Sequence, residues 1–143
     1  MTIRQLSVFA ANQPGTLLEI TDALGKAGVD IRAMSIADTM DFGIFRLIVN
    51  DIEKAKDALE GLGCVVSETP VIAAAISDEP GALNAVLKLL SENAINVEYM
   101  YAFIAVSKRF ANVVLRVEDN EKAIAILKEN GVKLVSDAEI QSL

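Results

Sequence analysis

Apolar and polar positions in the first part of the chain follow two periods, one typical of strands and one of helices. Period-two alternation at Leu6, Val8 and Ala10 indicates a strand with one buried face. Apolar residues spaced three or four positions apart indicate two amphipathic helices. The second begins after Asp51, a typical N-cap residue. The predicted elements are strand 6–10, helix 17–27, strand 31–37, a turn at 38–41, strand 42–49, helix 52–62 and strand 64–67.

The same pattern returns in the rest of the chain, which indicates an internal repeat. Leu17 and Leu24 match residues 66 positions later, and Asp51 matches Asp119 at an offset of 68. The two extra residues fall near Ser107-Lys108-Arg109 and predict a longer hairpin tip. Self-similarity over this length predicts two copies of one unit, residues 1–70 and 71–143, joined near Pro70. The second copy is predicted as strand 71–76, helix 83–90, strand 95–104, strand 111–117, helix 122–128 and strand 132–135.

The order β-α-β-β-α-β, repeated once, predicts an α+β protein built from two ferredoxin-like units. Each unit is expected to have an antiparallel sheet with both helices on one face. A unit of about seventy residues is marginally stable alone, so we expect the two units to pack side by side. Pairing of their edge strands would also cover an exposed sheet edge.

Composition excludes several classes of function. The net charge of −7 over 143 residues disfavours binding to nucleic acid or to an anionic membrane. Histidine is absent and Cys64 is the single cysteine, so we expect no disulfide, no metal site, no cofactor and no histidine-based catalysis. The N-terminus lacks the pattern of a signal peptide and no apolar run could span a bilayer, so we expect a cytoplasmic protein.

A Pro-Gly dipeptide stands between the first strand and first helix of each copy. Asn12-Gln13-Pro14-Gly15 recurs as Asp78-Glu79-Pro80-Gly81. A helix N-terminus presents unpaired N–H groups and the positive end of the helix dipole, so each copy is a candidate binding site for a carboxylate. A simple turn is the alternative for one such dipeptide, but two copies in register favour a binding site.

These motifs resemble the ACT domain family in both copies. In the second copy Ala94 replaces the usual glycine of the family, and we expect Asn93 to supply the turn. The residues that carry the resemblance are Asn12, Pro14, Gly15, Leu17, Gly28, Val29, Asp30 and Ile31, and then Asp78, Pro80, Gly81, Leu83, Ile95, Asn96 and Val97.

The resemblance implies a regulatory module of amino-acid metabolism. ACT domains bind a small ligand, usually an amino acid, where two such domains meet. The loop after the first strand of one domain and the start of the second strand of its neighbour supply the contacts. Such modules normally accompany an enzyme, and none is attached here. The ligand-binding residues that we expect are Asn12, Gln13, Pro14, Gly15, Thr16, Leu17, Asp30, Ile31, Asp78, Gly81, Ala82, Leu83, Asn96 and Val97.

The chemistry of these residues suits a zwitterionic amino acid, which needs N–H donors for its carboxylate and oxygen acceptors for its ammonium group. The loop backbones supply donors, and the acceptors differ between the copies. If each loop meets the strand start of the other unit, Asn12 joins Asn96 while Asp78 joins Asp30. Two carboxylates repel each other and a bound carboxylate, so we expect the amide site to be the stronger. Met34, Met100 and Tyr101 are expected to line the pocket, which favours an apolar or aromatic-like ligand side chain.

Three functions remain open from the sequence. The first is a free-standing amino-acid-binding regulator that acts on a partner enzyme. Such a regulator could also form a homodimer. The second is a dedicated regulatory subunit of a biosynthetic enzyme such as acetolactate synthase. That subunit is expected to carry one ACT unit followed by a different C-terminal domain, which disfavours it. The third is an enzyme that uses carboxylates alone, and the missing histidine makes it the weakest of the three.

Overall fold

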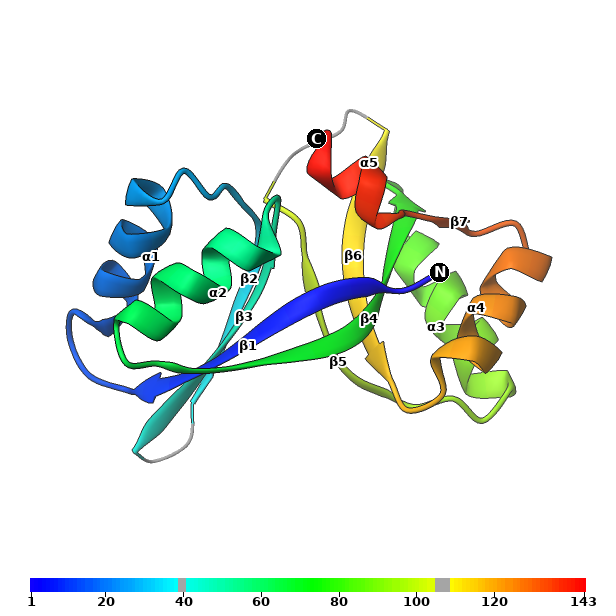
Figure 1. The fold of residues 1–143 in the computed structure, drawn as a ribbon. Helices are drawn as coiled ribbons and strands as arrows, with labels where there is room; N and C mark the ends of the chain where they lie inside the picture. Colours follow the sequence, from blue (N-terminus) through cyan, green and yellow to red (C-terminus); the bar gives the residue numbers. More distant parts are fainter. Residues whose placement is uncertain (39–40, 105–108) are drawn as a thin grey trace. The chain divides into compact units, whose positions relative to one another are not determined.

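The computed structural model describes residues 1–38, 41–104 and 109–143. Helices and strands follow one another along the chain in the order β-α-β-β-α-β-α-β-β-α-β-α (Figure 1). No helix in these ranges is long and apolar enough to cross a membrane. The elements are β1 (Ile3–Ala11), α1 (Thr16–Lys26), β2 (Ile31–Asp38), β3 (Phe42–Val49), α2 (Ile52–Gly61), β4 (Val65–Ser77), α3 (Ala82–Glu92), β5 (Val97–Ala102), β6 (Phe110–Val117), α4 (Asn120–Glu129), β7 (Lys133–Leu134) and α5 (Asp137–Gln141).

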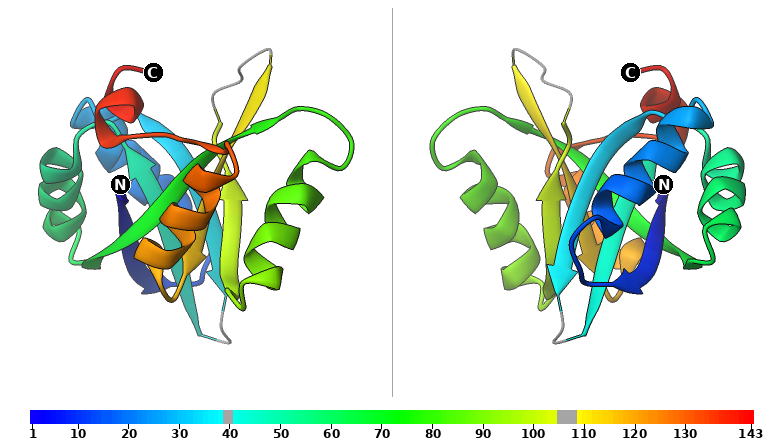
Figure 2. Two further views of the ribbon diagram at one scale, coloured as in Figure 1. Left: turned by 90° about the vertical axis from the view of Figure 1, so that its right-hand side faces the viewer. Right: turned by 90° about the vertical axis from the view of Figure 1, so that its left-hand side faces the viewer.

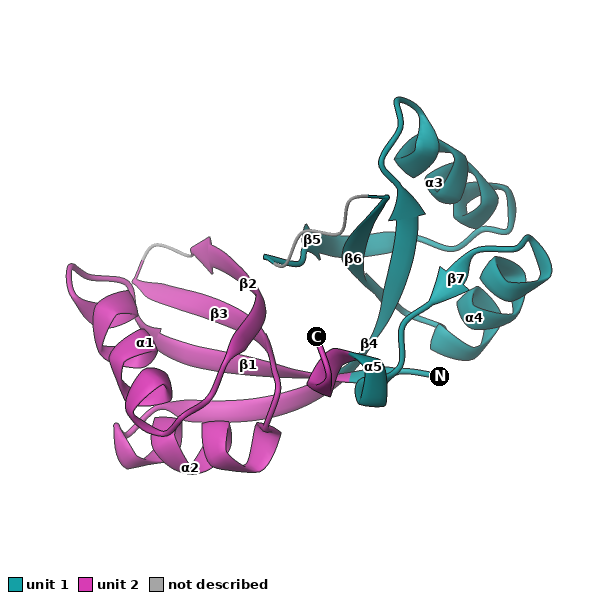
Figure 3. Ribbon diagram, turned by 90° about the horizontal axis from the view of Figure 1, so that it is seen from above, with its two compact units in different colours: residues 1–3, 70–139 teal, residues 4–69, 140–143 magenta. Residues whose placement is uncertain are grey.

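The chain divides into two compact units, which Figure 3 colours separately. Unit 1 contains Met1–Ile3 and Pro70–Glu139, and unit 2 contains Arg4–Thr69 and Ile140–Leu143. Strand β4 begins in unit 2 and ends in unit 1, so it serves both sheets. The C-terminal residues thus belong to the unit that is formed mainly by the first half of the chain.

In unit 2 the strand order is β2-β3-β1-β4, with β3 antiparallel to both β1 and β2. Helices α1 and α2 cover one face of this sheet (Figure 1). The core between sheet and helices includes Leu6, Leu24, Leu47 and Leu59, all fully buried. This is the predicted ferredoxin-like arrangement.

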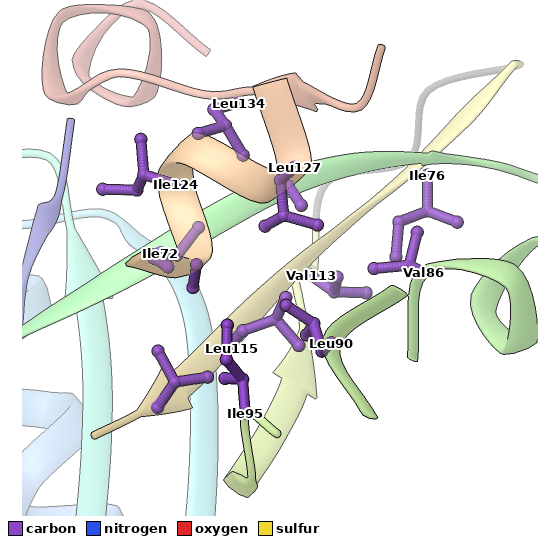
Figure 4. Packing of buried hydrophobic residues seen from close by; sticks show 13 residues of the cluster. Ile72, Ile76, Val86, Leu90, Ile95, Val113, Leu115, Ile124, Leu127 and Leu134 are labelled. Carbon is purple, nitrogen blue, oxygen red and sulfur yellow. The ribbon is translucent and has the colours of Figure 1, made fainter. Parts of the chain in front are cut away.

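Unit 1 repeats the arrangement in the order β5-β6-β4, with β7 on the other side of β4. The left view of Figure 2 looks onto the face that α3 and α4 cover. Ile72, Leu90, Leu115 and Leu127 belong to the buried cluster between these helices and the sheet (Figure 4). Both units therefore confirm the predicted fold class, with an antiparallel sheet and helices on one face.

Strand β4 corrects the sequence prediction of two separate strands, 64–67 and 71–76. A single strand, Val65–Ser77, runs through Pro70. Proline has no N–H to donate to a sheet, but its carbonyl can still accept. The Pro70 carbonyl accepts hydrogen bonds from Arg116 Nη1 at 3.4 Å and from Asn120 Nδ2 at 3.3 Å. The proline therefore lies within an ordered strand and does not mark a break between strands.

Smaller differences concern the second half of the chain. The predicted strand 95–104 is shorter, because β5 spans only Val97–Ala102. Helix α5 was not predicted, although a capping box begins it. Ser136 N–H donates to Glu139 Oε2 at 2.8 Å, and Glu139 N–H donates to Ser136 Oγ at 3.3 Å. The predicted hairpin tip at 107–109 and the turn at 38–41 lie partly outside the described residues.

The helix ends show both a confirmed and a wrong prediction. Asp51 caps α2 as predicted, since its Oδ1 accepts the Lys54 N–H at 3.1 Å. Gly28 follows α1 with a φ of 71°, in the left-handed region. At the matching place after α3, Ala94 itself takes the left-handed conformation, with a φ of 57°. Asn93 has a φ of −101° and so does not supply this turn.

Candidate functional site

The loop between β1 and α1 places the first group of predicted site residues on the surface of unit 2. Asn12, Gln13 and Pro14 are exposed. Gly15 forms the N-cap of α1 with a φ of 91°. A Cβ atom at this position would meet no atom within 4 Å, so the backbone conformation rather than crowding requires glycine. Gly81 begins α3 in the same way, with a φ of 86°.

The N–H groups at the start of α1 are only partly available to a ligand. Thr16 N–H donates to the Gln13 carbonyl at 3.3 Å, so it is already used. Within the described part of the chain, no acceptor meets the N–H groups of Gly15, Leu17 and Leu18. Leu18, which was not among the expected ligand-binding residues, therefore offers a further donor, and the Thr16 N–H is occupied. Three donors remain at the positive end of the helix dipole.

The loop between β4 and α3 in unit 1 has the same pattern. Ala82 N–H donates to the Glu79 carbonyl at 3.1 Å. The N–H groups of Gly81, Leu83 and Asn84 have no acceptor among the residues that the structure describes. A cavity of about 350 Å³ lies beside this loop. Its lining residues are Ser77, Asp78, Glu79, Arg109 and Phe110.

The second group of predicted residues stands at the strand starts, Asp30-Ile31 in unit 2 and Asn96-Val97 in unit 1. The Asp30 carboxylate lies 2.6 Å from Arg32 Nη1, so it already has a cationic partner. Asn96 is exposed and borders a cavity of about 550 Å³. The other residues that line this cavity are Ala94, Ile95, Glu118, Asp119, Asn120, Glu121 and Lys122.

The two predicted amide ligands have free side chains. In the described ranges, neither the Asn12 nor the Asn96 amide group forms a hydrogen bond within the protein. Both side chains are exposed, so the donor and acceptor of each amide are available to a bound molecule. Asp30 differs, because its partner Arg32 uses one of its oxygens. The sequence reasoning missed Arg32, although an oppositely charged residue two positions along a strand was a visible signal.

Each unit holds its loop and its strand start at opposite ends of its sheet. In unit 2, β3 begins opposite Ala11 and ends opposite Ile31. Strand β3 has 8 residues, so the two ends are roughly 24 Å apart at the usual rise of a strand. In unit 1, β6 likewise begins opposite Ser77 and ends opposite Val97. No unit can therefore place its own loop and its own strand start on one small ligand.

Two of the three residues predicted as apolar pocket walls contact the core of their own unit, and their place in a ligand pocket stays a prediction. Met34 packs against the core of unit 2, and Met100 packs against the core of unit 1. Tyr101 is also buried, with 9% of its surface exposed. Both methionines are partly buried, so each leaves part of its side chain exposed.

Metal binding has no support in the residues that the structure describes. In residues 1–38, 41–104 and 109–143, no group of three or more His, Cys, Asp or Glu side chains could hold a metal ion. The candidate site is therefore built from backbone N–H groups, amides and carboxylates. These groups suit a small polar organic ligand.

Comparisons with known proteins agree with this architecture. The crystal structure of protein BT0572 from Bacteroides thetaiotaomicron is 38% identical, with a TM-score of 0.92, and the match covers 100% of this chain and 98% of that chain. The ligand-free regulatory subunit of aspartate kinase from Thermus thermophilus is 18% identical, with a TM-score of 0.67 and coverage of 90% and 92%. The regulatory subunit of aspartate kinase from Thermus flavus is also 18% identical, with a TM-score of 0.61 and coverage of 88% and 90%.

The aspartate kinase subunits are similar to this chain in fold, and BT0572 is similar in both fold and sequence. A comparison with curated proteins found no match. The model of the ACT domain pair family matches residues 1–143. The chain therefore belongs to the ACT domain pair family.

Proposed function

We propose that this protein is a free-standing regulator that binds a free amino acid and acts on a partner enzyme. The observation that carries the proposal is the separation of loop and strand start within each unit. Each end offers unused hydrogen-bonding groups, and each alone is only half of a site for a zwitterion. A complete site needs the loop of one ACT unit and the strand start of another, from the same chain or from a second copy.

The chemistry of the two halves is complementary to an amino acid. The N–H groups of Leu17 and Leu18 can donate to the ligand carboxylate at the positive end of α1. An asparagine oxygen from the strand start of another unit can accept from the ligand ammonium group. Each charge-assisted hydrogen bond of this kind is stronger than one between neutral groups.

The site that pairs Asn12 with Asn96 is proposed to be the stronger of two. Its two amides have no partner in the described part of the chain, and they add no charge beside the ligand carboxylate. The alternative pair, Asp78 with Asp30, brings two carboxylates toward the ligand. Arg32 neutralises the Asp30 carboxylate but also engages one of its oxygens, so Asp30 is a poorer acceptor for an ammonium group.

A dedicated regulatory subunit of a biosynthetic enzyme is the second candidate. The aspartate kinase regulatory subunits have the same fold over about nine-tenths of both chains, which favours this candidate for an enzyme of that kind. A subunit of the acetolactate synthase kind was expected to have a different C-terminal domain. The second unit here repeats the fold of the first, which disfavours it. Pull-down from the native cell, followed by identification of a stoichiometric catalytic chain, would distinguish a dedicated subunit from a free-standing sensor.

A thermal-shift screen of free amino acids tests the binding function. At a hundredfold excess over the dissociation constant, a ligand stabilises the folded protein by about 2.7 kcal/mol. At least one amino acid should therefore raise the melting temperature by several degrees. Absence of any shift with every amino acid at millimolar concentration would contradict the proposal.

The protein is also proposed to have no catalytic activity of its own. It has no histidine, and Cys64 is its single cysteine. Burial raises the pKa of the Cys64 thiol, which makes it a weak nucleophile at neutral pH. Assays for hydrolysis and group transfer on purified protein should show no turnover. Turnover that co-purifies with the chain and disappears when one of its carboxylates is replaced would contradict this.

A further inference from the structure

A cavity of about 200 Å³ adjoins the β1–α1 loop within unit 2. Gln13 of the loop lines it, together with Thr16 and Glu19 from the first turn of α1. Cys64, at the start of β4, lines the other side. Its volume is several times the roughly 30 Å³ of one water molecule, which leaves room for a short alkyl chain with a polar end.

Three polar side chains around this cavity have no partner among the residues that the structure describes. Among the described residues, Gln13, Thr16 and Glu19 form no side-chain hydrogen bond, and Glu19 forms no ion pair. Glu19 and Cys64 line the same cavity, and the negative charge of Glu19 adds to the effect of burial in raising the pKa of the Cys64 thiol. Three oxygen acceptors, one of them charged, thus border one small cavity.

The internal repeat shows that the fold does not require these side chains. With the offsets of 66 and 68 residues, Thr16 and Glu19 correspond to Ala82 and Ala85, and Cys64 corresponds to Val132. Unit 1 therefore builds the same corner from small apolar residues. The hydroxyl, the carboxylate and the thiol are specific to unit 2, so packing alone does not explain them.

The wall of the cavity also carries apolar surface. Phe9 and Leu62 line it and remain 41% and 46% exposed, respectively. Apolar side chains at this exposure can cover the methylene groups of a ligand without belonging to the core. A carboxylate at one point and apolar walls elsewhere match an alkyl chain that ends in a cation.

We propose that this cavity receives the side-chain ammonium group of the bound amino acid, so that the protein selects a ligand with a cationic side chain, such as L-lysine or L-ornithine. The inference rests on the proposed function, because the loop beside the cavity holds the ligand carboxylate. Glu19 supplies the counter-charge, and Gln13 and Thr16 accept further hydrogen bonds from the ammonium group.

Calorimetric titration with L-lysine and L-norleucine tests the role of Glu19. The two ligands share the same four-carbon side chain, and only lysine carries the terminal ammonium group. The wild-type protein should bind lysine at least about tenfold more tightly, which is the effect of one charge-assisted hydrogen bond. Glu19→Gln should remove this preference. Asp22→Asn is the matched control, because Asp22 lies on the same helix but does not line the cavity. Its carboxylate pairs with Lys26 Nζ at a distance of 2.8 Å.

Alkylation of Cys64 gives a second readout that reports on the cavity itself. As the single cysteine, Cys64 can be followed by mass spectrometry after treatment with iodoacetamide. L-lysine should slow the reaction in the wild-type protein and in Asp22→Asn, but not in Glu19→Gln. L-norleucine at the same concentration should protect Cys64 much less.

The outcomes separate this inference from the proposed function. Equal affinity for lysine and norleucine, with binding lost in Asn12→Ala, would overturn the cavity assignment and leave the loop site intact. Protection of Cys64 by lysine that persists in Asn12→Ala and Asn96→Ala would support the cavity and overturn the loop site. Binding of other amino acids but of neither lysine nor ornithine would overturn the cavity assignment. Absence of binding by any amino acid would contradict both.

Discussion

Arg32 holds the carboxylate of Asp30, with Nη1 and Oδ2 separated by 2.6 Å. The Arg32 side chain is only 13% exposed, and its Nη2 also donates to the Gln141 carbonyl at 3.4 Å. Both partners lie within unit 2. The pair thus joins the start of β2 to the C-terminal segment, which gives Asp30 a structural role that competes with ligand binding.

Replacement of either asparagine in the proposed amide site should abolish most amino-acid binding. Asn12→Ala and Asn96→Ala each remove a free amide that faces solvent, so the folded protein should keep its stability. Asp30→Ala and Asp78→Ala are the controls and should retain most of the affinity. Calorimetric titration of the four variants measures this. Two equal sites per chain, or binding lost only in the aspartate variants, would show that the pairing is different.

Asp30→Ala should lower stability even though it spares binding. It leaves the largely buried guanidinium of Arg32 without its counter-ion, which costs about 1–2 kcal/mol when the partner is itself partly exposed. Denaturation by urea measures the change. Asp22→Ala, which breaks an exposed pair on α1, is the control and should change stability by less than about 0.5 kcal/mol. Equal effects of the two variants would argue against a structural role for Asp30.

Ala94→Gly should stabilise the protein. Ala94 has a φ of 57°, which an L-residue adopts at a cost of about 1 kcal/mol that glycine does not incur. The greater freedom of glycine in the unfolded chain offsets part of this, so we expect a gain of about 0.5 kcal/mol.

The matching position in the other unit provides the reverse experiment. Gly28 has a φ of 71°, and a Cβ there would meet no atom within 4 Å, so backbone strain alone opposes a side chain. Gly28→Ala should therefore destabilise the protein by about 1 kcal/mol in the same denaturation assay. Loss of stability in Ala94→Gly would show that the Ala94 methyl group contributes more than its strained backbone costs.

Acid should remove the contribution of the Glu68 ion pairs. Hydrogen bonds from Arg4 and Lys56 lower the pKa of Glu68 from 4.5 to about 2. Because the folded-state pKa is lowered, the stabilisation is complete above about pH 4.5 and is lost as the pH falls toward 2. Glu68→Gln should therefore lower stability by about 0.5–1 kcal/mol at pH 7, a small value because the side chains are partly exposed.

The pH dependence provides the control within the same pair of proteins. Wild type and Glu68→Gln should converge in stability between pH 4 and 2, as the wild-type carboxylate becomes protonated. A difference that stays constant down to pH 2 would show that the substitution acts through packing instead of charge.

The fold could be predicted from the sequence because its signals are local and occur twice. The N-cap at Asp51 and the alternation of Val113, Leu115 and Val117 depend only on neighbouring residues. The continuous strand β4 was not predicted because a proline usually interrupts a strand. Pro70 is accommodated here because its carbonyl accepts hydrogen bonds from Arg116 and Asn120, which are distant in sequence.

The candidate site was less predictable for the same reason. The loop and its glycines follow from local sequence, and the role of Asn12 and Asn96 as acceptors stays a prediction. The ion pair of Asp30 and the cavity beside Glu19 arise from tertiary packing. Glu19 is exposed on a helix, where sequence reasoning expects only a solvated charge.

The interleaved boundary of the two units has a consequence for synthesis on the ribosome. Residues 140–143 group with residues 4–69, yet they emerge only after all of residues 70–139 have been made. Unit 2 therefore cannot reach its final set of contacts until residues 70–139 of unit 1 have been translated. We expect the nascent chain to mature in one late step, in which Gln141 reaches Arg32, instead of one domain after the other.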